Sequence, residues 1–227
     1  MTLPRRVHAV VFDMDGLLVD TETLCRDAMT TQARAMGLEL PLPVFHGMIG
    51  TSHARSDEIL LDHFGRGFAL AEFHARWTER FYLEVEAGAA LKDGVVELLD
   101  ELDLQGLPRA ICTSSPHHGV DRNLKPHDLK RRFDAVVAQG DYTHGKPHPE
   151  PFLAAAAALG ARPEDCLALE DSHNGVRAAH GAGMMTVMVP DLLEPTPEIS
   201  GLCVRIAESL HDVRALIRAQ STSREQA

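Results

Sequence analysis

The chain has 227 residues, of which 44% are hydrophobic, and its 33 acidic and 22 basic side chains give a formal net charge of −11 at pH 7. An acidic chain without a run of Lys and Arg does not suit nucleic acid or an anionic membrane surface, and no apolar run approaches the ~18 residues that span a bilayer. The length suits one large domain, or one domain that carries a smaller inserted one.

The four cysteines are widely separated, and none of them stands at a CxxC or Cys/His spacing typical of zinc sites. This usage is typical of a reducing compartment, so we expect a cytoplasmic protein. The histidine pairs His117-His118 and His144/His148 would suit a metal, although solvated loops are the favoured interpretation. Nothing in the sequence requires more than a monomer.

Five short apolar runs that end in polar residues are predicted to be strands, at residues 7–13, 108–114, 133–139, 166–171 and 185–190. Helix-like segments lie between and after them, at residues 94–106, 116–124, 149–161, 172–183 and 209–219. Ser172 is predicted to cap the fourth of these helices. Strands that alternate with helices indicate an α/β fold with a parallel sheet covered on both faces.

The interval from about residue 21 to residue 85 interrupts this alternation, because it contains helix signals and no convincing strand. Five apolar residues recur there at helical spacing: Leu70, Phe73, Trp77, Phe81 and Val85. Core packing of a small helical bundle is the favoured interpretation of this stripe, and an aromatic ligand-binding box is the alternative. The sequence therefore predicts a helical insert between the first and second strands. The polar tail, residues 221–227, is expected to be disordered.

An acidic pair, Asp13 and Asp15, stands at the end of the first predicted strand, within the stretch FDMDGLLVDTE. Residues two apart in an extended chain point to the same side, so both would face the crevice beyond the carboxyl end of the strand, where ligands bind in open α/β sheets. Gly16 allows a tight turn at this point. A hard cation such as Mg²⁺ would remove the repulsion between the two carboxylates.

Other interpretations of this stretch compete. A calcium loop of the EF-hand type fails on spacing, because Leu17 and Leu24 occupy two of the ligand positions. A plain acidic turn stays open on the motif alone. Asp20 and Thr21 either cap the helix that follows or take part in function.

Hydroxyl side chains follow the second predicted strand. Thr113 and Ser114 place hydroxyl and backbone N–H groups at another strand end, and Ser115-Pro116 predicts a helix N-cap followed by proline at the first helical position. A helix N-terminus with hydroxyl groups suits phosphate, while a plain helix start is the alternative.

Charged residues follow the third and fourth predicted strands. Lys146 lies in a loop stiffened by Pro147 and Pro149, and a positive charge there would balance both a phosphate group and Asp13. Glu170 and Asp171 end the fourth strand, beside the first acidic pair. An acidic pair in a loop is ordinarily solvated, but at the carboxyl end of a parallel strand metal ligation explains it better.

These four segments, DMDGLLVDTE, CTSSP, GKPHPEPF and LEDSHNG, resemble in this order the signature motifs of the haloacid dehalogenase (HAD) superfamily of phosphohydrolases. The resemblance spans roughly residues 7–189 and is closest to the branch of β-phosphoglucomutase and the sugar-phosphate phosphatases. It implies a Rossmann-like parallel-sheet core at residues 1–18 and 88–220, and an inserted α-helical cap domain at residues 19–87.

The resemblance also implies roles for the motif residues. Asp13 would be the nucleophile that forms an aspartyl-phosphate, and Asp15 the general acid and base. Thr113 and Ser114 would hold the transferring phosphoryl group, and Lys146 would neutralise it.

The same resemblance implies a magnesium site. Asp13, the backbone carbonyl of Asp15, and Asp171 would bind Mg²⁺, with Glu170 in or near the ligand set. The partner expected is a small phosphorylated metabolite. The branch implies a sugar or polyol phosphate, and phosphoglycolate or a nucleotide stays open.

Three positions separate a phosphatase from a β-phosphoglucomutase-type mutase. Where the mutase pattern has a histidine, an arginine in the early cap loop and a lysine-asparagine pair, this chain has Cys25, His53 with Arg55 two residues later, and Pro116-His117. These departures favour hydrolysis, with the mutase as the alternative.

A non-catalytic phosphate-binding protein is disfavoured, because Asp13, Lys146 and the other motif residues are present.

Overall fold

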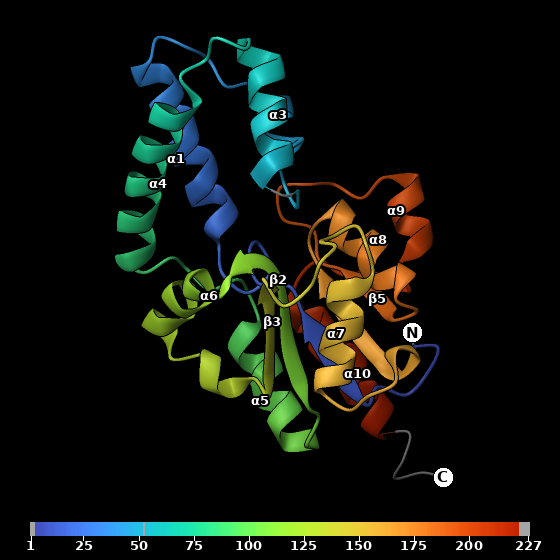
Figure 1. Ribbon diagram of the computed structural model, residues 1–227. Helices are drawn as coiled ribbons and strands as arrows, with labels where there is room; N and C mark the ends of the chain where they lie inside the picture. Colours follow the sequence, from blue (N-terminus) through green and yellow to red (C-terminus); the bar gives the residue numbers. More distant parts are fainter. Residues whose placement is uncertain (1–2, 52, 223–227) are drawn as a thin grey trace.

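The computed structural model describes residues 3–51 and 53–222, and its centre is a six-stranded parallel sheet of order β3-β2-β1-β4-β5-β6 (Figure 1). The strands are β1 Ala9–Phe12, β2 Arg109–Pro116, β3 Ala135–Gln139, β4 Cys166–Glu170, β5 Met185–Met188 and β6 Arg205–Ile206. The predicted α/β fold with a parallel sheet is confirmed. The two-residue edge strand β6 was not predicted, since it is too short and too exposed to show an apolar run.

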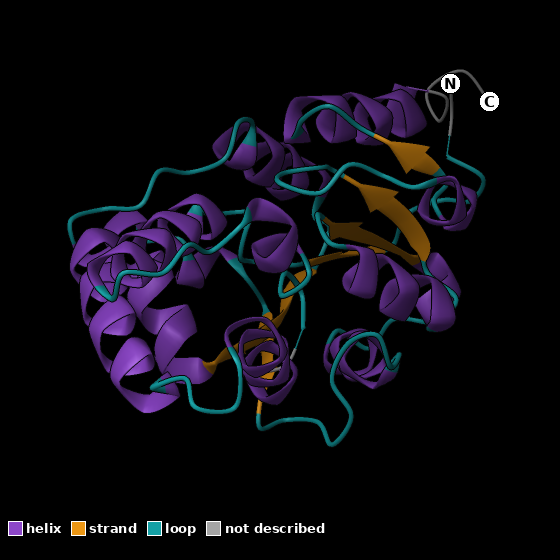
Figure 2. Cartoon of the chain, turned by 90° about the horizontal axis from the view of Figure 1, so that it is seen from above, coloured by secondary structure: helices purple, strands orange, loops and turns teal. Residues whose placement is uncertain are grey.

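Alternate residues of the central strand pack against opposite layers, as the period of two requires. Val10 and Phe12 belong to one buried cluster, and Ala9 and Val11 belong to another. The first layer contains α5 Val95–Gln105, α6 His117–Leu124 and α10 Leu210–Thr222, and the second contains α7 Glu150–Ala158 and α8 His173–Gly181. Seen from above, helices lie on both sides of the strands (Figure 2).

The chain changes direction across the sheet at β1, which lies between β2 and β4. The strands that follow β2 continue to one edge, and those that follow β4 continue to the other. This switch point is where the loops after neighbouring strands diverge and leave a crevice for a ligand. Asp13 follows β1 directly, and Asp171 follows β4 directly, so both stand at the crevice.

Of the five helices described between β1 and β2, the first four stand above the sheet in Figure 1. They are α1 Thr21–Ala35, α2 Leu42–His46, α3 His53–Phe64 and α4 Leu70–Glu86. Eight buried residues form a separate apolar cluster within this group, among them Phe45, Leu60 and Phe73. The boundaries of the cap at residues 19–87 stay a prediction, and a separate cluster of this kind is what such a cap would contain.

Two details of the helices differ from expectation. Strand β2 runs on through Pro116, so α6 begins at His117 and Ser115 is not its N-cap. Helix α10 reaches Thr222 and overlaps the tail predicted from residue 221, and residues 223–227 lie outside the described residues. Among residues 3–51 and 53–222, none of the helices has both the length and the apolar character needed to cross a bilayer.

Candidate active site

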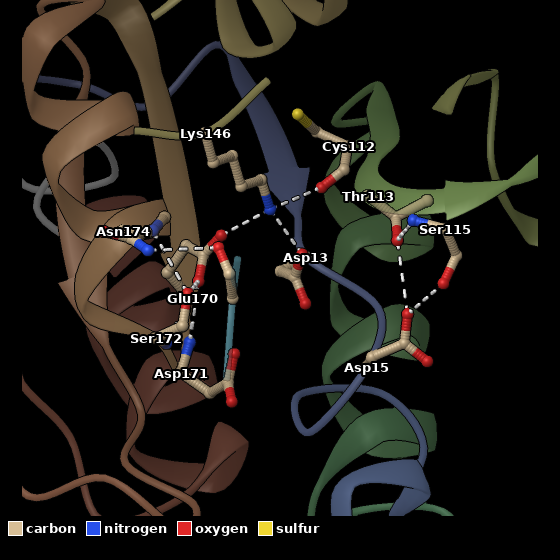
Figure 3. Close-up of polar contacts among 12 residues, drawn as sticks. Asp13, Asp15, Cys112, Thr113, Ser115, Lys146, Glu170, Asp171, Ser172 and Asn174 are labelled. Carbon is tan, nitrogen blue, oxygen red and sulfur yellow. Dashed lines mark hydrogen bonds and ion pairs between the residues drawn. The ribbon is translucent and has the colours of Figure 1, made fainter. Parts of the chain in front are cut away.

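The floor of the crevice is built on a buried lysine between two buried acids (Figure 3). Lys146 Nζ lies 2.5 Å from Asp13 Oδ1 and 2.5 Å from Glu170 Oε1, and it donates a third hydrogen bond of 3.0 Å to the backbone oxygen of Cys112. The lysine side chain is 2% exposed, so its charge is neutralised by neighbours rather than by water. These contacts hold the pKa of Lys146 well above its ordinary value, and the ammonium stays charged.

Glu170 joins this lysine to the first turn of α8. Its Oε2 accepts hydrogen bonds from the backbone N–H of Asp171 and of Ser172, both at 3.1 Å, and from Ser172 Oγ at 3.0 Å. Ser172 Oγ in turn accepts the Gly175 N–H at 3.1 Å, which confirms the predicted N-cap. Only glycine fits at Gly175, because a Cβ there would lie 1.8 Å from Glu170 Oε1.

Three buried carboxylates offer ligand atoms that all lie within 4.8 Å of one another: those of Asp13, Glu170 and Asp171. The pKa of Asp13 is raised to about 8, because burial and the charges of Glu170 and Asp15 outweigh the lowering effect of Lys146. Burial and the charges of Asp13 and Glu170 also raise the pKa of Asp171 well above its ordinary value. Among the described residues, no side chain bonds the Asp171 carboxylate, so a hard divalent cation fits this oxygen-only set.

The carboxylate of Asp15 turns away from this cluster toward α6 (Figure 3). Its Oδ1 accepts from Thr21 Oγ1 at 2.8 Å and from Asn123 Nδ2 at 3.1 Å. Its Oδ2 accepts from Ser115 Oγ at 2.8 Å and from Thr113 Oγ1 at 3.3 Å. These donors fix the orientation of the carboxylate at the rim of the crevice.

Sequence reasoning missed two of these four donors. Asn123 lies inside α6 and carries no motif signal, and Ser115 was assigned to a helix cap that the structure replaces with the bond to Asp15. For Thr21 the sequence predicts either capping or a part in function, and in the structure its hydroxyl donates a hydrogen bond to Asp15. Asp20 occupies the N-cap position of α1, but its side chain makes no capping bond.

The two predicted phosphate-binding hydroxyl residues have different environments in the structure. Thr113 is buried and contributes its hydroxyl to Asp15, whereas Ser114 is half-buried and lines the crevice. Tyr142 supports this strand end from the side, since its hydroxyl donates to the backbone oxygen of Thr113 at 3.0 Å. Ser114 and Lys146 thus border the same open space above Asp13.

A cavity of about 780 Å³ extends from this floor to the cap helices. Asp13, Asp15, Thr113, Ser114, Lys146 and Asp171 all line it. From the loop before α3, Gly50 and Thr51 line the cavity as well, and so does His53 at the start of α3. Arg55 lies on the exposed surface beside Glu58.

Close approach at Gly50 joins the cap loop to the core. Its φ is +67°, and a Cβ there would lie 2.8 Å from Ser172 Oγ. Asn174 Nδ2, on α8, donates to the Gly50 carbonyl at 3.2 Å. The loop before α3 therefore rests on the same helix start that orients Glu170.

The apolar stripe of the cap divides between two environments. Phe73 and Val85 are fully buried, as core packing predicts. Trp77 and Phe81 are half-buried and line the cavity, so for these two residues the core interpretation was incomplete.

A second cluster of possible ligands lies on the surface at His144, His148 and Glu150. The Glu150 carboxylate already accepts the Thr143 N–H at 2.7 Å and His144 Nδ1 at 2.8 Å. These bonds account for the shape of the loop that carries Lys146, in agreement with the predicted solvated loop.

Comparison with known proteins identifies the family. The chain matches the haloacid dehalogenase-like hydrolases over residues 7–183. It is 36% identical to YhcW of Bacillus subtilis (84% of this chain, 86% of that protein) and 34% identical to hexitol phosphatase B of Escherichia coli (84% and 86%).

Solved structures of related proteins have the same fold as this chain. Crystal structures of CbbY from Rhodobacter sphaeroides, one with phosphate and one with xylulose-(1,5)bisphosphate, superpose with a TM-score of 0.74 at 28% and 27% identity and cover 89% of this chain and 94% of theirs. The chain therefore belongs to the haloacid dehalogenase-like hydrolase family, as its four motifs predict.

Proposed function

We propose that this enzyme, a phosphoric monoester hydrolase, releases phosphate from a small phosphorylated metabolite through an aspartyl-phosphate intermediate. The observation that carries the proposal is the position of Asp13, a buried carboxylate at the floor of a cavity. It lies beside the ammonium group of Lys146 and the carboxylate of Asp171, to which no side chain of the described residues donates a hydrogen bond. The similarity to hexitol phosphatase B supports a sugar or polyol phosphate as substrate. A cytoplasmic location and a monomeric state belong to the same proposal.

Asp13 is suited to attack phosphorus. Lys146 holds its Oδ1, which leaves Oδ2 to form the bond to phosphorus while the bond to the leaving oxygen breaks. The product of this step is an acyl phosphate, which water attacks more readily than the ester that a serine nucleophile would give. Water then forms a new bond to phosphorus, and the Asp13 carboxylate and inorganic phosphate are regenerated.

Asp15 is suited to move the proton in both steps. It would donate a proton to the leaving oxygen in the first step and accept one from the attacking water in the second. Its position two residues after the nucleophile puts it at the rim of the cavity, within reach of a group bound above Asp13. Four hydrogen-bond donors orient it there, as described above.

Ser114, Thr113 and Lys146 are suited to hold the phosphoryl group. The ammonium of Lys146 touches the nucleophile directly, so positive charge is present where negative charge would develop. Ser114 lines the cavity from the neighbouring strand end and offers a hydroxyl.

The acidic cluster fits Mg²⁺. Asp13, Asp171 and the backbone carbonyl of Asp15 would hold it, with Glu170 beside them, and the bound ion would neutralise charge on the phosphoryl oxygens. Glu170 already receives four hydrogen bonds or ion pairs from Lys146 and the start of α8. Its contribution would therefore be to orient Lys146 as well as to attract the ion.

The structure favours hydrolysis over the mutase alternative at the positions named above. Cys25, His53 and Pro116 all line the cavity, so the mutase residues would face the substrate at these places, and this chain lacks them. Each departure thus includes a residue that lines the cavity, whereas His117 of the third is exposed and pairs with Asp141.

The test is a magnesium-dependent screen against phosphorylated metabolites that includes β-glucose 1-phosphate, with both free phosphate and glucose 6-phosphate measured. We expect free phosphate from several substrates in the presence of Mg²⁺ and none in EDTA. Formation of glucose 6-phosphate without free phosphate would establish the mutase instead. Absence of any turnover, with phosphate binding retained, would establish the non-catalytic alternative.

A further inference from the structure

One face of α4 forms the cap side of the cavity, and we name this face the α4 wall. Its residues are His74, Trp77, Thr78, Phe81 and Tyr82. All five are half-buried, and they recur at the three- and four-residue spacing of one helix face. The α4 wall therefore presents mainly aromatic surface to whatever group is bound above the floor.

Hydrogen bonds hold the central ring of this wall in place. Trp77 Nε1–H donates to His74 Nδ1 at 3.1 Å, and His74 Nε2 lies 2.6 Å from Asp57 Oδ1 on α3. Since Nδ1 accepts, the ring proton of a neutral His74 lies on Nε2 and is donated to Asp57. Trp77 also meets Phe81 edge to face, with ring centroids 6.0 Å apart. The indole is thus a fixed surface before substrate arrives.

Acidic side chains outnumber lysine and arginine among the described residues that line the cavity. Among the described lining residues Lys146 is the only lysine or arginine, and its ammonium already contacts Asp13 and Glu170. The lining also includes the carboxylates of Asp15, Glu22 and Asp171. A second anionic group on a substrate would therefore meet carboxylates, aromatic rings and the imidazoles of three lining histidines (His53, His74 and His118). The described lining has no further lysine or arginine to pair with it.

Arg122 is close to the α4 wall but does not open into the cavity. Its guanidinium carbon lies 3.6 Å from the centroid of the Tyr82 ring, and its Nε lies 3.7 Å from Glu86 Oε1. Neither Arg122 nor Glu86 is a lining residue. The guanidinium therefore contacts Tyr82 and Glu86 and stands outside the lining of the cavity, and its Nη1 is buried without a hydrogen-bond partner among the described residues.

We propose that this enzyme selects phosphomonoesters whose leaving group is uncharged and carries a ring, with the α4 wall as the surface for the ring and Trp77 as its specificity-determining residue. The inference rests on the proposed function and narrows its substrate class. Flat or ring-shaped groups stack on fixed aromatic side chains, and the volume of about 780 Å³ exceeds the needs of a two-carbon leaving group. Bisphosphates and phosphoglycolate, whose leaving groups carry a second negative charge, are disfavoured.

Two matched substrate pairs test the charge requirement. Phenyl phosphate and 4-carboxyphenyl phosphate share one ring and differ by a carboxylate, and fructose 6-phosphate and fructose 1,6-bisphosphate differ by a phosphate. Assays at pH 8 keep free imidazole mostly neutral. We expect kcat/KM to be at least tenfold higher for the member of each hydrolysed pair whose leaving group is uncharged.

Equal or higher kcat/KM for the member with the charged leaving group overturns the inference and leaves the phosphatase proposal intact. Failure to hydrolyse phenyl phosphate and every metabolite overturns the phosphatase proposal itself.

Substitutions in the α4 wall test the surface. We expect Trp77→Ala to raise KM for phenyl phosphate about tenfold and Trp77→Phe to recover most of the loss, because phenylalanine keeps a ring. Phe64→Ala is the matched control, since Phe64 packs in the cap beside Phe68 and does not line the cavity. A KM change in Trp77→Ala no larger than in this control overturns the assignment of Trp77.

A gain-of-function variant completes the test. Thr78→Arg places a guanidinium on the wall and is expected to raise the ratio of kcat/KM for 4-carboxyphenyl phosphate over phenyl phosphate at least tenfold. Thr78→Lys serves the same purpose if the arginine variant unfolds at a lower temperature. An unchanged ratio in a folded variant shows that α4 does not face the leaving group and overturns the inference.

Discussion

The floor of the cavity and the α4 wall are built in opposite ways. The floor consists of charged side chains at the ends of separate strands and in the loop after β3. Glu170 is fully buried, the Lys146 side chain is 2% exposed, and ion pairs join Lys146 to Asp13 and Glu170. The wall consists of half-buried rings on one helix, fixed by a single chain of hydrogen bonds from Asp57 through His74 to Trp77. The floor is built to react with phosphorus, and the wall is built to contact the rest of the substrate.

This difference has a consequence for substitutions. Changes in the floor should affect every substrate alike, because all substrates place a phosphoryl group there. Changes in the α4 wall should alter the order of substrates and spare the chemistry.

The largest effect is expected for Asp13→Asn. The amide is a poor nucleophile and cannot form the acyl phosphate, so turnover should fall at least about a thousandfold for every substrate in the panel. Phosphate release with Mg²⁺ measures the loss, and circular dichroism shows whether the fold is intact. Asp27→Asn, at an exposed position of α1, is the matched control and should keep full activity. Activity like that of the wild type in Asp13→Asn would exclude Asp13 as the nucleophile.

A smaller but still large effect is expected for Gly175→Ala. A Cβ at this position would lie 1.8 Å from Glu170 Oε1, so the carboxylate must move and Lys146 loses one of its two ion pairs. We expect about a hundredfold loss of kcat and a lower melting temperature.

Gly181→Ala on the same helix separates this effect from helix propensity. Its Cβ would meet Pro149 at 3.6 Å, an ordinary contact, so activity and melting temperature should stay at or above those of the wild type. Equal behaviour of the two alanine variants would show that Glu170 has no part in holding the floor.

The clustered acids predict how stability depends on pH and metal. Burial raises the pKa of Asp13 from 3.8 to about 8, so between these values the folded state binds a proton that the unfolded state has lost. The free energy of unfolding of the metal-free protein should therefore fall as pH rises from about 4 to 8. Each kcal/mol corresponds to about 2–4 °C in a chain of this size.

Thermal unfolding in EDTA at pH 5.5 and pH 8, with and without added Mg²⁺, measures this effect. Mg²⁺ binds the deprotonated acids, so it should raise the melting temperature more at pH 8 than at pH 5.5. The difference between the wild type and Asp13→Asn isolates the contribution of Asp13, because other groups titrate in both proteins. A metal-free melting temperature that rises between the two pH values by the same amount in both proteins would contradict the raised pKa.

The floor and the wall also differ in how far sequence predicts them. Asp13 and Asp171 end predicted strands, and Lys146 stands in the loop after another, so a parallel sheet is expected to bring all three to one edge. For Trp77 and Phe81 the helical stripe was visible, but its period does not show which part of the stripe other helices cover. Phe73 is covered by the cap cluster, and Trp77 is open to the cavity, a difference made by tertiary packing.

Within the floor, too, the sequence does not reveal contacts that depend on tertiary packing. Asn123 has no neighbour in sequence that marks it, because it reaches Asp15 only through the packing of α6 against β2. Ser115 was misassigned because a serine before proline is typical of a helix start, and the structure extends the strand through Pro116 instead. Single residues that orient a motif residue from another element are thus the part of a site that short motifs do not reveal.

The smallest effect is expected for Asn123→Ala. Its side-chain amide gives one of four hydrogen bonds to Asp15, and Thr21, Ser115 and Thr113 still orient the carboxylate when it is lost. We expect kcat to fall about tenfold, the order of one hydrogen bond to a charged group, with KM within about twofold. Asn123→Asp should lower kcat further, because it sets a second carboxylate against Asp15. Loss confined to KM, or equal kcat in both variants and the wild type, would show that Asn123 supports the packing of α6 and does not position Asp15.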